Sequence, residues 1–141
     1  MVDFSKYIKE AYKDLSEPDY GFVKAALNGD RYLEIGPEFV KMGFVVEDDT
    51  EPNTDVCRTL ILSKEDSHLC IKLSFVGPFA AVFPLNDKVP AVESIVTVLS
   101  AHDLQVMQKD LLVQPYDINL LDVDTDSTLY NALFSSDMMP V

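Results

Sequence analysis

The chain opens with a pattern typical of an amphipathic helix. Within residues 4–15 apolar side chains recur at intervals of three and four residues, and lysines and acidic residues occupy most positions between them. This period places the apolar residues on one face of a helix. Pro18 ends the pattern, and a shorter helix is expected over residues 20–27, because Asn28-Gly29 is a pair suited to a helix end.

The centre of the chain has the pattern of an antiparallel sheet. Three apolar, partly alternating runs are separated only by short segments typical of turns, which predicts a meander of strands. These runs cover residues 56–63, 67–75 and 79–83. With a turn at residues 64–66, Cys57 would face about Leu73 and Cys70 about Leu60. The two cysteines are therefore expected to be free thiols that pack in the core.

Two further segments precede this meander. Residues 31–35 look like a strand, which would be bounded by Gly36-Pro37. Residues 39–46 are apolar and end in β-branched side chains, so they fit either a strand or one helical turn followed by a strand. We predict a strand over residues 31–35, and the type of the second segment stays open.

The last third of the chain again has helical signals. A valine-rich helix is expected to follow residues 87–90, which offer an aspartate cap and a proline, and to run to about Ala101. Residues 104–116 fit helix and strand about equally well. Asp126 or Ser127 is expected to cap a closing helix. Its apolar face consists of Leu129, Tyr130, Leu133 and Phe134.

Helices, then strands, then helices make up the predicted order of elements. At 141 residues and 48% hydrophobic content, the chain has the size and apolar content of one ordinary domain. We therefore expect a single α+β domain over residues 1–141, in which a mainly antiparallel sheet meander is flanked by N-terminal and C-terminal helices.

The charge balance narrows the classes of partner. The chain has 24 acidic and 11 basic residues, a net charge of −13, and neither lysine nor arginine after Lys109. A negative field of this size repels nucleic acid and anionic membranes and speeds encounters with a basic protein. The first residues lack the basic start of a signal peptide, and no apolar stretch is long enough to span a membrane. We expect a cytoplasmic protein that binds neither nucleic acid nor membrane.

Motifs for catalysis and cofactor binding are missing from the sequence. The five glycines form no phosphate-binding loop, and two cysteines are too few for a paired-cysteine zinc site. His68 is expected at a hairpin turn and His102 after a helix, where surface or capping roles are more common than general-base catalysis. The sequence therefore predicts a protein without catalytic residues, cofactor or metal, and an enzyme is a minor alternative.

An acidic segment between two predicted strands is the first candidate for a partner-binding surface. Its nine residues include five carboxylates, those of Glu47, Asp48, Asp49, Glu51 and Asp55. Such a cluster is most often a solvated loop. Alternatively, it docks on lysines and arginines of a partner protein. Binding of a hard metal cation is a third, minor alternative, because metal sites usually space their carboxylates more regularly.

A second acidic surface is expected nearer the end of the chain. Residues 122–126 read Asp-Val-Asp-Thr-Asp, like the opening of a calcium-binding EF-hand loop. However, Ser127 stands where that loop needs glycine and Leu133 where it needs glutamate, so an acidic loop before a helix is the better interpretation. We rank this surface below the first as a partner contact. Its candidate carboxylates are those of Asp117, Asp122, Asp124 and Asp126.

The segment 127–137 resembles the closing segment of a known class of proteins. Residues 128–134 read Thr-Leu-Tyr-Asn-Ala-Leu-Phe and follow the predicted meander and valine-rich helix. This layout is similar to several families of small acidic immunity proteins, which bacteria encode beside secreted toxin domains. The resemblance implies a cytoplasmic inhibitor that binds a cognate toxin, often a nuclease or another cytotoxic enzyme, and blocks its active site or a nearby surface.

An acidic surface suits this function. Toxins that act on nucleic acid are commonly basic where they hold phosphate, and carboxylates can occupy such a site. Acidic charge would raise the association rate, whereas apolar or aromatic contacts would set the residence time. A small acidic adaptor or chaperone-like module, with transient partners and no toxin, is the alternative.

Overall fold

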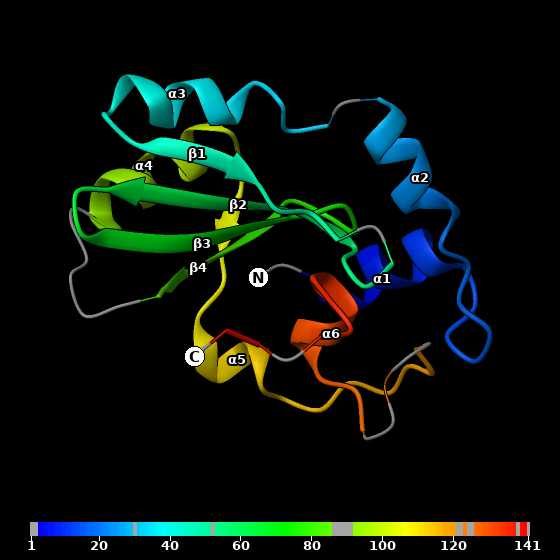
Figure 1. The fold of residues 1–141 in the computed structure, drawn as a ribbon. Helices are drawn as coiled ribbons and strands as arrows, with labels where there is room; N and C mark the ends of the chain where they lie inside the picture. The colour runs from blue at the N-terminus through cyan, green and yellow to red at the C-terminus, as the bar shows by residue number, and fades with distance from the viewer. Residues whose placement is uncertain are drawn as a thin grey trace.

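The computed structural model describes residues 3–29, 31–51, 53–85, 92–120, 123, 126–137 and 139–140. Within these residues the chain forms a five-stranded sheet with helices before and after it, which confirms the expected α+β class (Figure 1). The helices are α1 (Phe4–Tyr12), α2 (Gly21–Asn28), α3 (Ile35–Lys41), α4 (Val92–Ala101), α5 (Lys109–Leu112) and α6 (Leu129–Leu133). The strands are β1 (Val45–Asp48), β2 (Cys57–Lys64), β3 (Ser67–Ser74), β4 (Phe79–Pro84) and β5 (Gln105–Val106).

The sheet is the predicted meander with one strand added at each end. Its strand order is β1-β2-β3-β4-β5, and only the short β5 pairs parallel to its neighbour. Cys57 lies opposite Ser74 and Cys70 opposite Ile61, one position from the predicted register. The shift arises because the β2–β3 turn contains two residues rather than three, with Glu65 in the left-handed region at a φ of 56°. Both thiols are free and buried.

The prediction of a strand over residues 31–35 is wrong. Residues 31–34 form a turn in which Tyr32 has a φ of 72°, and α3 begins at Ile35. The pair Gly36-Pro37, expected to bound a strand, lies instead in the first turn of α3. A proline is well tolerated there, because the first N–H groups of a helix have no partner within it.

Two segments whose secondary structure the sequence left open each contain both helix and strand. Residues 39–46 follow the second alternative, a helical turn and then a strand, since they contain the end of α3 and the start of β1. Residues 104–116 contain both predicted types, because β5 and α5 lie within them. The expected cap of the valine-rich helix, residues 87–90, lies outside the described residues.

The closing helix α6 begins one residue later than predicted. Its cap is Thr128 rather than Asp126 or Ser127: the Thr128 hydroxyl accepts a hydrogen bond from the Asn131 amide, and the Asn131 side chain accepts one from the Thr128 amide. This reciprocal pair satisfies two backbone donors at once.

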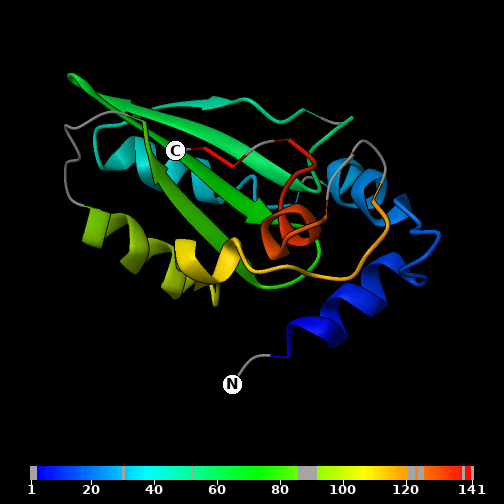
Figure 2. The same ribbon diagram turned by 90° about the horizontal axis from the view of Figure 1, so that it is seen from below.

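Helices cover both faces of the sheet. On one face α3 packs against β1, where a methyl group of Val46 lies beside Gly36, and α4 lies on the same side of the sheet (Figures 1 and 2). On the other face Tyr130 of α6 meets Phe83 of β4 edge-on, with ring centroids 6.0 Å apart. The central strands β2, β3 and β4 are therefore buried on both faces.

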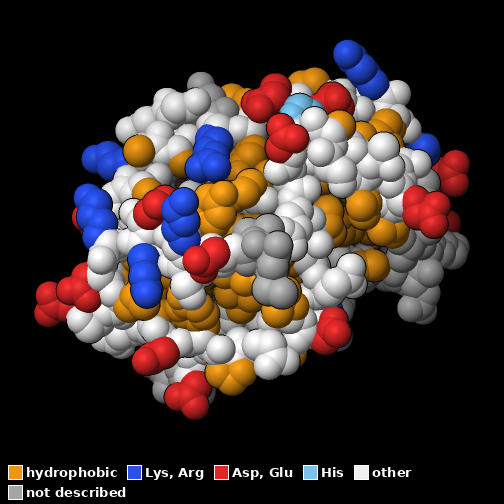
Figure 3. Space-filling model, turned by 180° about the vertical axis from the view of Figure 1, so that it is seen from behind, with side chains coloured by type: hydrophobic (Ala, Val, Ile, Leu, Met, Phe, Trp, Pro, Cys, Tyr) orange, Lys and Arg blue, Asp and Glu red, His pale blue; other side chains and the backbone are white. Residues whose placement is uncertain are grey.

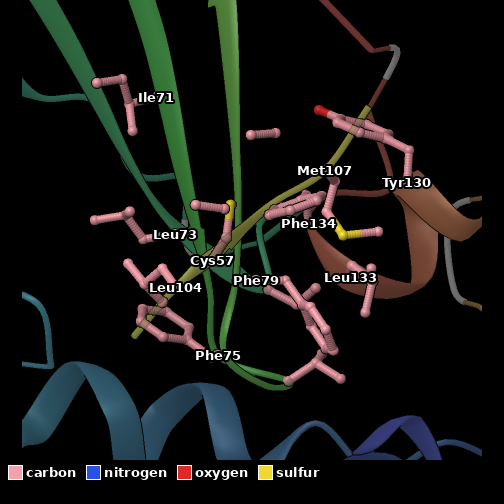
Figure 4. Packing of buried hydrophobic residues seen from close by; sticks show 14 of the residues in the cluster. Cys57, Ile71, Leu73, Phe75, Phe79, Leu104, Met107, Tyr130, Leu133 and Phe134 are labelled. Atoms are coloured by element: carbon pink, nitrogen blue, oxygen red, sulfur yellow. The ribbon is translucent and has the colours of Figure 1, made fainter. Parts of the chain in front are cut away.

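The hydrophobic core joins both ends of the chain to the sheet. Phe4 and Tyr7 of α1 pack on Phe79 with ring centroids 5.1 and 5.4 Å apart, and the Tyr12 hydroxyl donates to the Ala132 carbonyl of α6 at 2.7 Å. In Figure 4 apolar side chains from the strands, the following loops and α6 lie close around one another. Those labelled there are Cys57, Ile71, Leu73, Phe75, Phe79, Leu104, Met107, Tyr130, Leu133 and Phe134.

Candidate functional site

The acidic segment, residues 47–55, runs from the end of β1 to the start of β2. The structure separates its five carboxylates into two groups. Glu47, Asp49 and Glu51 are exposed. Asp48 and Asp55 are held by basic side chains of the sheet, so the segment is anchored at two points. Asp55 is buried, whereas the side chain of Asp48 is still 42% exposed.

The first anchor joins Asp48 to Arg58 of β2. Arg58 Nη1 lies 2.6 Å from Asp48 Oδ2, and Arg58 Nε donates to the Arg31 carbonyl at 2.8 Å. Asp48 Oδ1 also accepts hydrogen bonds from the backbone and hydroxyl of Thr50 at 3.0 and 2.6 Å. Partial burial raises the pKa of the Asp48 carboxyl, but the Thr50 hydrogen bonds and Arg58 outweigh this effect, so the pKa lies below its usual value.

The second anchor is a buried ion pair between Asp55 and Lys72 of β3. Lys72 Nζ lies 3.8 Å from Asp55 Oδ1, and the two side chains are only 8% and 5% exposed. Thr59 bridges them, because its hydroxyl donates to Asp55 Oδ2 at 2.8 Å and accepts from Lys72 Nζ at 3.0 Å. Asp55 Oδ2 also accepts from the Glu51 amide at 3.0 Å. The expectation that Asp55 belongs to an exposed cluster is therefore wrong.

The end of the acidic segment also pairs with the chain that follows α6. The Val56 amide donates to the Phe134 carbonyl at 2.8 Å, and the Ser136 amide donates to the Thr54 carbonyl at 3.0 Å. These two hydrogen bonds join residues 54–56 to residues 134–136 in an antiparallel arrangement. The position of the segment thus depends on contacts with residues far away in the sequence.

A cavity of about 420 Å³ adjoins the acidic segment. Asn53, Thr54 and Asp55 form one side of it, and α2 forms another. Its size falls in the range of roughly 300–1,000 Å³ that is typical of ligand pockets. Its apolar wall consists of Tyr12, Tyr20, Val23, Leu27, Val56 and Leu120. A cavity with this lining can receive an apolar or aromatic side chain of a partner.

The second acidic surface is described only in part. Asp117 and Asp126 are exposed and line one surface hollow together with Tyr116 and Asn119. Asp122 and Asp124 lie outside the described residues. Among the residues that the structure does describe, no group of three or more histidine, cysteine or carboxylate side chains is arranged to hold a metal ion.

The cysteines and histidines occur in different surroundings. Burial raises the pKa of the Cys57 thiol to about 12, and burial also raises the pKa of the Cys70 thiol, which keeps both thiols protonated at neutral pH. His102 contacts Glu38 across α4 and α3, and His68 Nδ1 lies 3.0 Å from the Ser63 hydroxyl. The sulfur atoms therefore belong to the core, as the sequence predicted.

Exposed basic side chains occur along α1, α2 and the chain beside them. Lysines and arginines gather on one side of the rear face, around the region of α1 and α2 (Figure 3). Lys6, Lys9, Lys13, Lys24 and Arg31 are all exposed there. The exposed carboxylates of Glu10, Asp14, Glu17 and Asp19 lie among them, so this region is of mixed charge. In the described part of the chain, no helix is long and apolar enough to cross a membrane.

Sequence reasoning missed the basic residues that anchor the acidic segment. Arg58 and Lys72 each interrupt an otherwise apolar strand, and a charged residue inside a buried strand signals a buried partner. That signal shows that a partner is needed but does not name it. Comparison with known proteins found no matching family model, no matching curated protein and no matching solved structure.

Proposed function

We propose that this protein is an immunity protein that binds and neutralises a cognate bacterial toxin domain, for example a nuclease, by blocking its active site or a nearby surface. The observation that carries the proposal is the anchored acidic segment, which presents Glu47, Asp49 and Glu51 to solvent while Arg58 and Lys72 hold its two ends. A carboxylate surface held in this way is complementary to a basic site that binds phosphate.

Charge and apolar contact would have different tasks in such a complex. The carboxylates of Glu47, Asp49 and Glu51, within a protein of net charge −13, would speed association with a basic surface. The adjoining cavity would receive an apolar or aromatic side chain of the toxin, and such buried anchors dominate the residence time of protein complexes. The function needs no catalysis or cofactor, and we expect it to be exercised in the cytoplasm.

The first experiment is a pull-down from the source cells with the tagged protein, followed by washes of rising ionic strength. We expect one retained partner with a basic, toxin-like domain that survives high salt, and co-expression of the protein is expected to protect cells from that domain. Several weak partners that are all lost at moderate salt, without protection, would contradict the proposal and favour an adaptor.

The second experiment measures association kinetics with that partner. The triple variant Glu47→Gln, Asp49→Asn, Glu51→Gln is expected to slow association about tenfold at low salt and to reduce its dependence on salt. A matched control carries three neutralised carboxylates elsewhere on the surface, through Glu10→Gln, Glu17→Gln and Glu93→Gln. Equal slowing by both variants would mean that net charge acts at long range and that the acidic segment is not part of the interface.

A further inference from the structure

The strand β1 is an open edge of the sheet. It is the first strand in the order β1-β2-β3-β4-β5 and pairs only with β2 within the described chain. The Asp49 amide donates to the Thr59 carbonyl at 2.8 Å. Because hydrogen-bonded pairs alternate along an antiparallel ladder, Val45 and Glu47 also bond toward β2, while the backbone groups of Val46 and Asp48 point outward.

These outward groups have no partner among the described residues. No helix, turn or loop hydrogen bond in this part of the chain involves the backbone of Val46 or Asp48. Natural sheets usually protect such an edge with charged side chains, a proline, a bulge or an overlying element. Here β1 has no proline, its charged side chains are both acidic, and its first residue, Val45, is 72% exposed. Acidic side chains repel another acidic strand but not a basic one.

The side chains along this edge define what kind of strand can join it. Val45, Glu47 and Asp49 lie on one face of the sheet, since successive residues of a strand alternate between faces. Glu47 and Asp49 are exposed carboxylates two residues apart. Opposite charges directly across a strand pair are stabilising, and like charges are destabilising.

We propose that β1 binds an extended basic segment of the partner, which adds a sixth strand to the sheet. The backbone of the segment would donate hydrogen bonds to, and accept hydrogen bonds from, the backbone of Val46 and Asp48. Its basic side chains, at two alternate positions, would lie across from Glu47 and Asp49. A second copy of this chain fits less well, because each copy has a charge of −13 and would bring its own acidic edge to the contact. The identity of the partner rests on the proposed function, whereas the chemistry of the edge does not.

Hydrogen exchange of the native complex tests the edge without any variant. With the partner found by pull-down bound, the amides of Val46 and Asp48 are expected to exchange at least tenfold more slowly than in the free protein. The amide of Glu47 is already bonded to β2 and is expected to change less. Unchanged exchange at Val46 and Asp48 in a saturated complex would overturn the proposal.

A pair of substitutions separates the backbone contact from the side chain. Val46→Pro removes an N–H that points away from β2, so the sheet is expected to stay intact. It is expected to weaken partner binding about tenfold or more. Val46→Ala loses the same contact with Gly36 but keeps the N–H, and is expected to bind within about threefold of the wild type. Equal binding by both variants, with native circular dichroism, would exclude strand addition.

A peptide tests the same edge independently of any toxin. Acetyl-Val-Lys-Val-Lys-Val-amide is titrated into the ¹⁵N-labelled protein, with the corresponding glutamate peptide as control. Changes in the NMR chemical shifts of the amides of residues 45–49 are expected with the lysine peptide only. If they appear while no toxin is ever neutralised, the edge proposal stands and the immunity function fails. If neither peptide shifts these amides, or if the free protein dimerises and protects them, a basic partner strand is excluded.

Discussion

The buried pair of Asp55 and Lys72 offers a direct test of how the acidic segment is held. Lys72→Met keeps a long side chain but removes the ammonium group that faces Asp55 and donates to Thr59. The side chains of Asp55 and Lys72 are only 5% and 8% exposed, so water cannot solvate the Asp55 carboxylate once its counter-ion is gone. Removing one partner of a buried ion pair costs about 3–5 kcal/mol. Because Asp55 keeps its hydrogen bonds from Thr59 and the Glu51 amide, we expect a loss of about 3 kcal/mol.

Urea unfolding followed by circular dichroism measures this loss. Asp55→Asn in the Lys72→Met background removes the carboxylate that has lost its counter-ion, so the double variant is expected to be about 1–2 kcal/mol more stable than Lys72→Met alone. Lys24→Met, at an exposed lysine, serves as the control and is expected to stay within about 0.5 kcal/mol of the wild type. A loss below about 1 kcal/mol, or a double variant less stable than either single one, would refute the reasoning.

Two further predictions concern the core. Burial raises the pKa of the Cys57 thiol from 9.0 to about 12, so between these pH values the unfolded chain loses a proton that the folded chain keeps. The free energy of unfolding is therefore expected to fall as the pH rises from about 9 to about 12, and to fall less in Cys57→Ala. Urea unfolding at several pH values measures this dependence. An equal dependence on pH in the wild type and in Cys57→Ala would contradict the raised pKa of Cys57. Gly77→Ala would place a methyl group 2.6 Å from Phe79, and we expect a loss of about 1–3 kcal/mol. Gly36→Ala is the control: it lies inside α3, and its new methyl group would have its nearest neighbour 3.8 Å away. This variant is expected to raise the melting temperature. A similar loss of stability in both alanine variants would rule out the steric explanation for Gly77.

Local patterns predicted much of the fold. The periodic apolar residues of α1 and the short turns of the meander act between near neighbours, and both were correct to within a few residues. Residues 31–35 were assigned wrongly because a segment of five residues, only three of them apolar or aromatic, is too short to show a period of its own. Packing of α3 on β1 decides their structure. Thr128 became the cap because it alone pairs reciprocally with Asn131.

The candidate site was harder to predict than the fold. Density of charge singled out the acidic segment as a candidate, but it could not separate its exposed carboxylates from Asp55. That separation depends on Lys72, which lies 17 positions further along and reaches Asp55 only when β2 and β3 pair in one register. The cavity is equally non-local, because its wall combines α1, α2 and residues near Leu120. Such features follow from tertiary contacts, which one sequence pattern does not contain.

The hydrogen bonds between residues 54–56 and residues 134–136 also set a time order during synthesis. The acidic segment leaves the ribosome before the residues that bind its end, so its final position must wait until residues 134–136 have been made. Contacts over so long a sequence separation form late, since a large loop must close first. A nascent chain halted before Phe134 would carry every exposed carboxylate of the acidic segment but would lack the contacts that hold its end. The end of the acidic segment would therefore become fixed in one step, when the chain around Ser135 docks beside it.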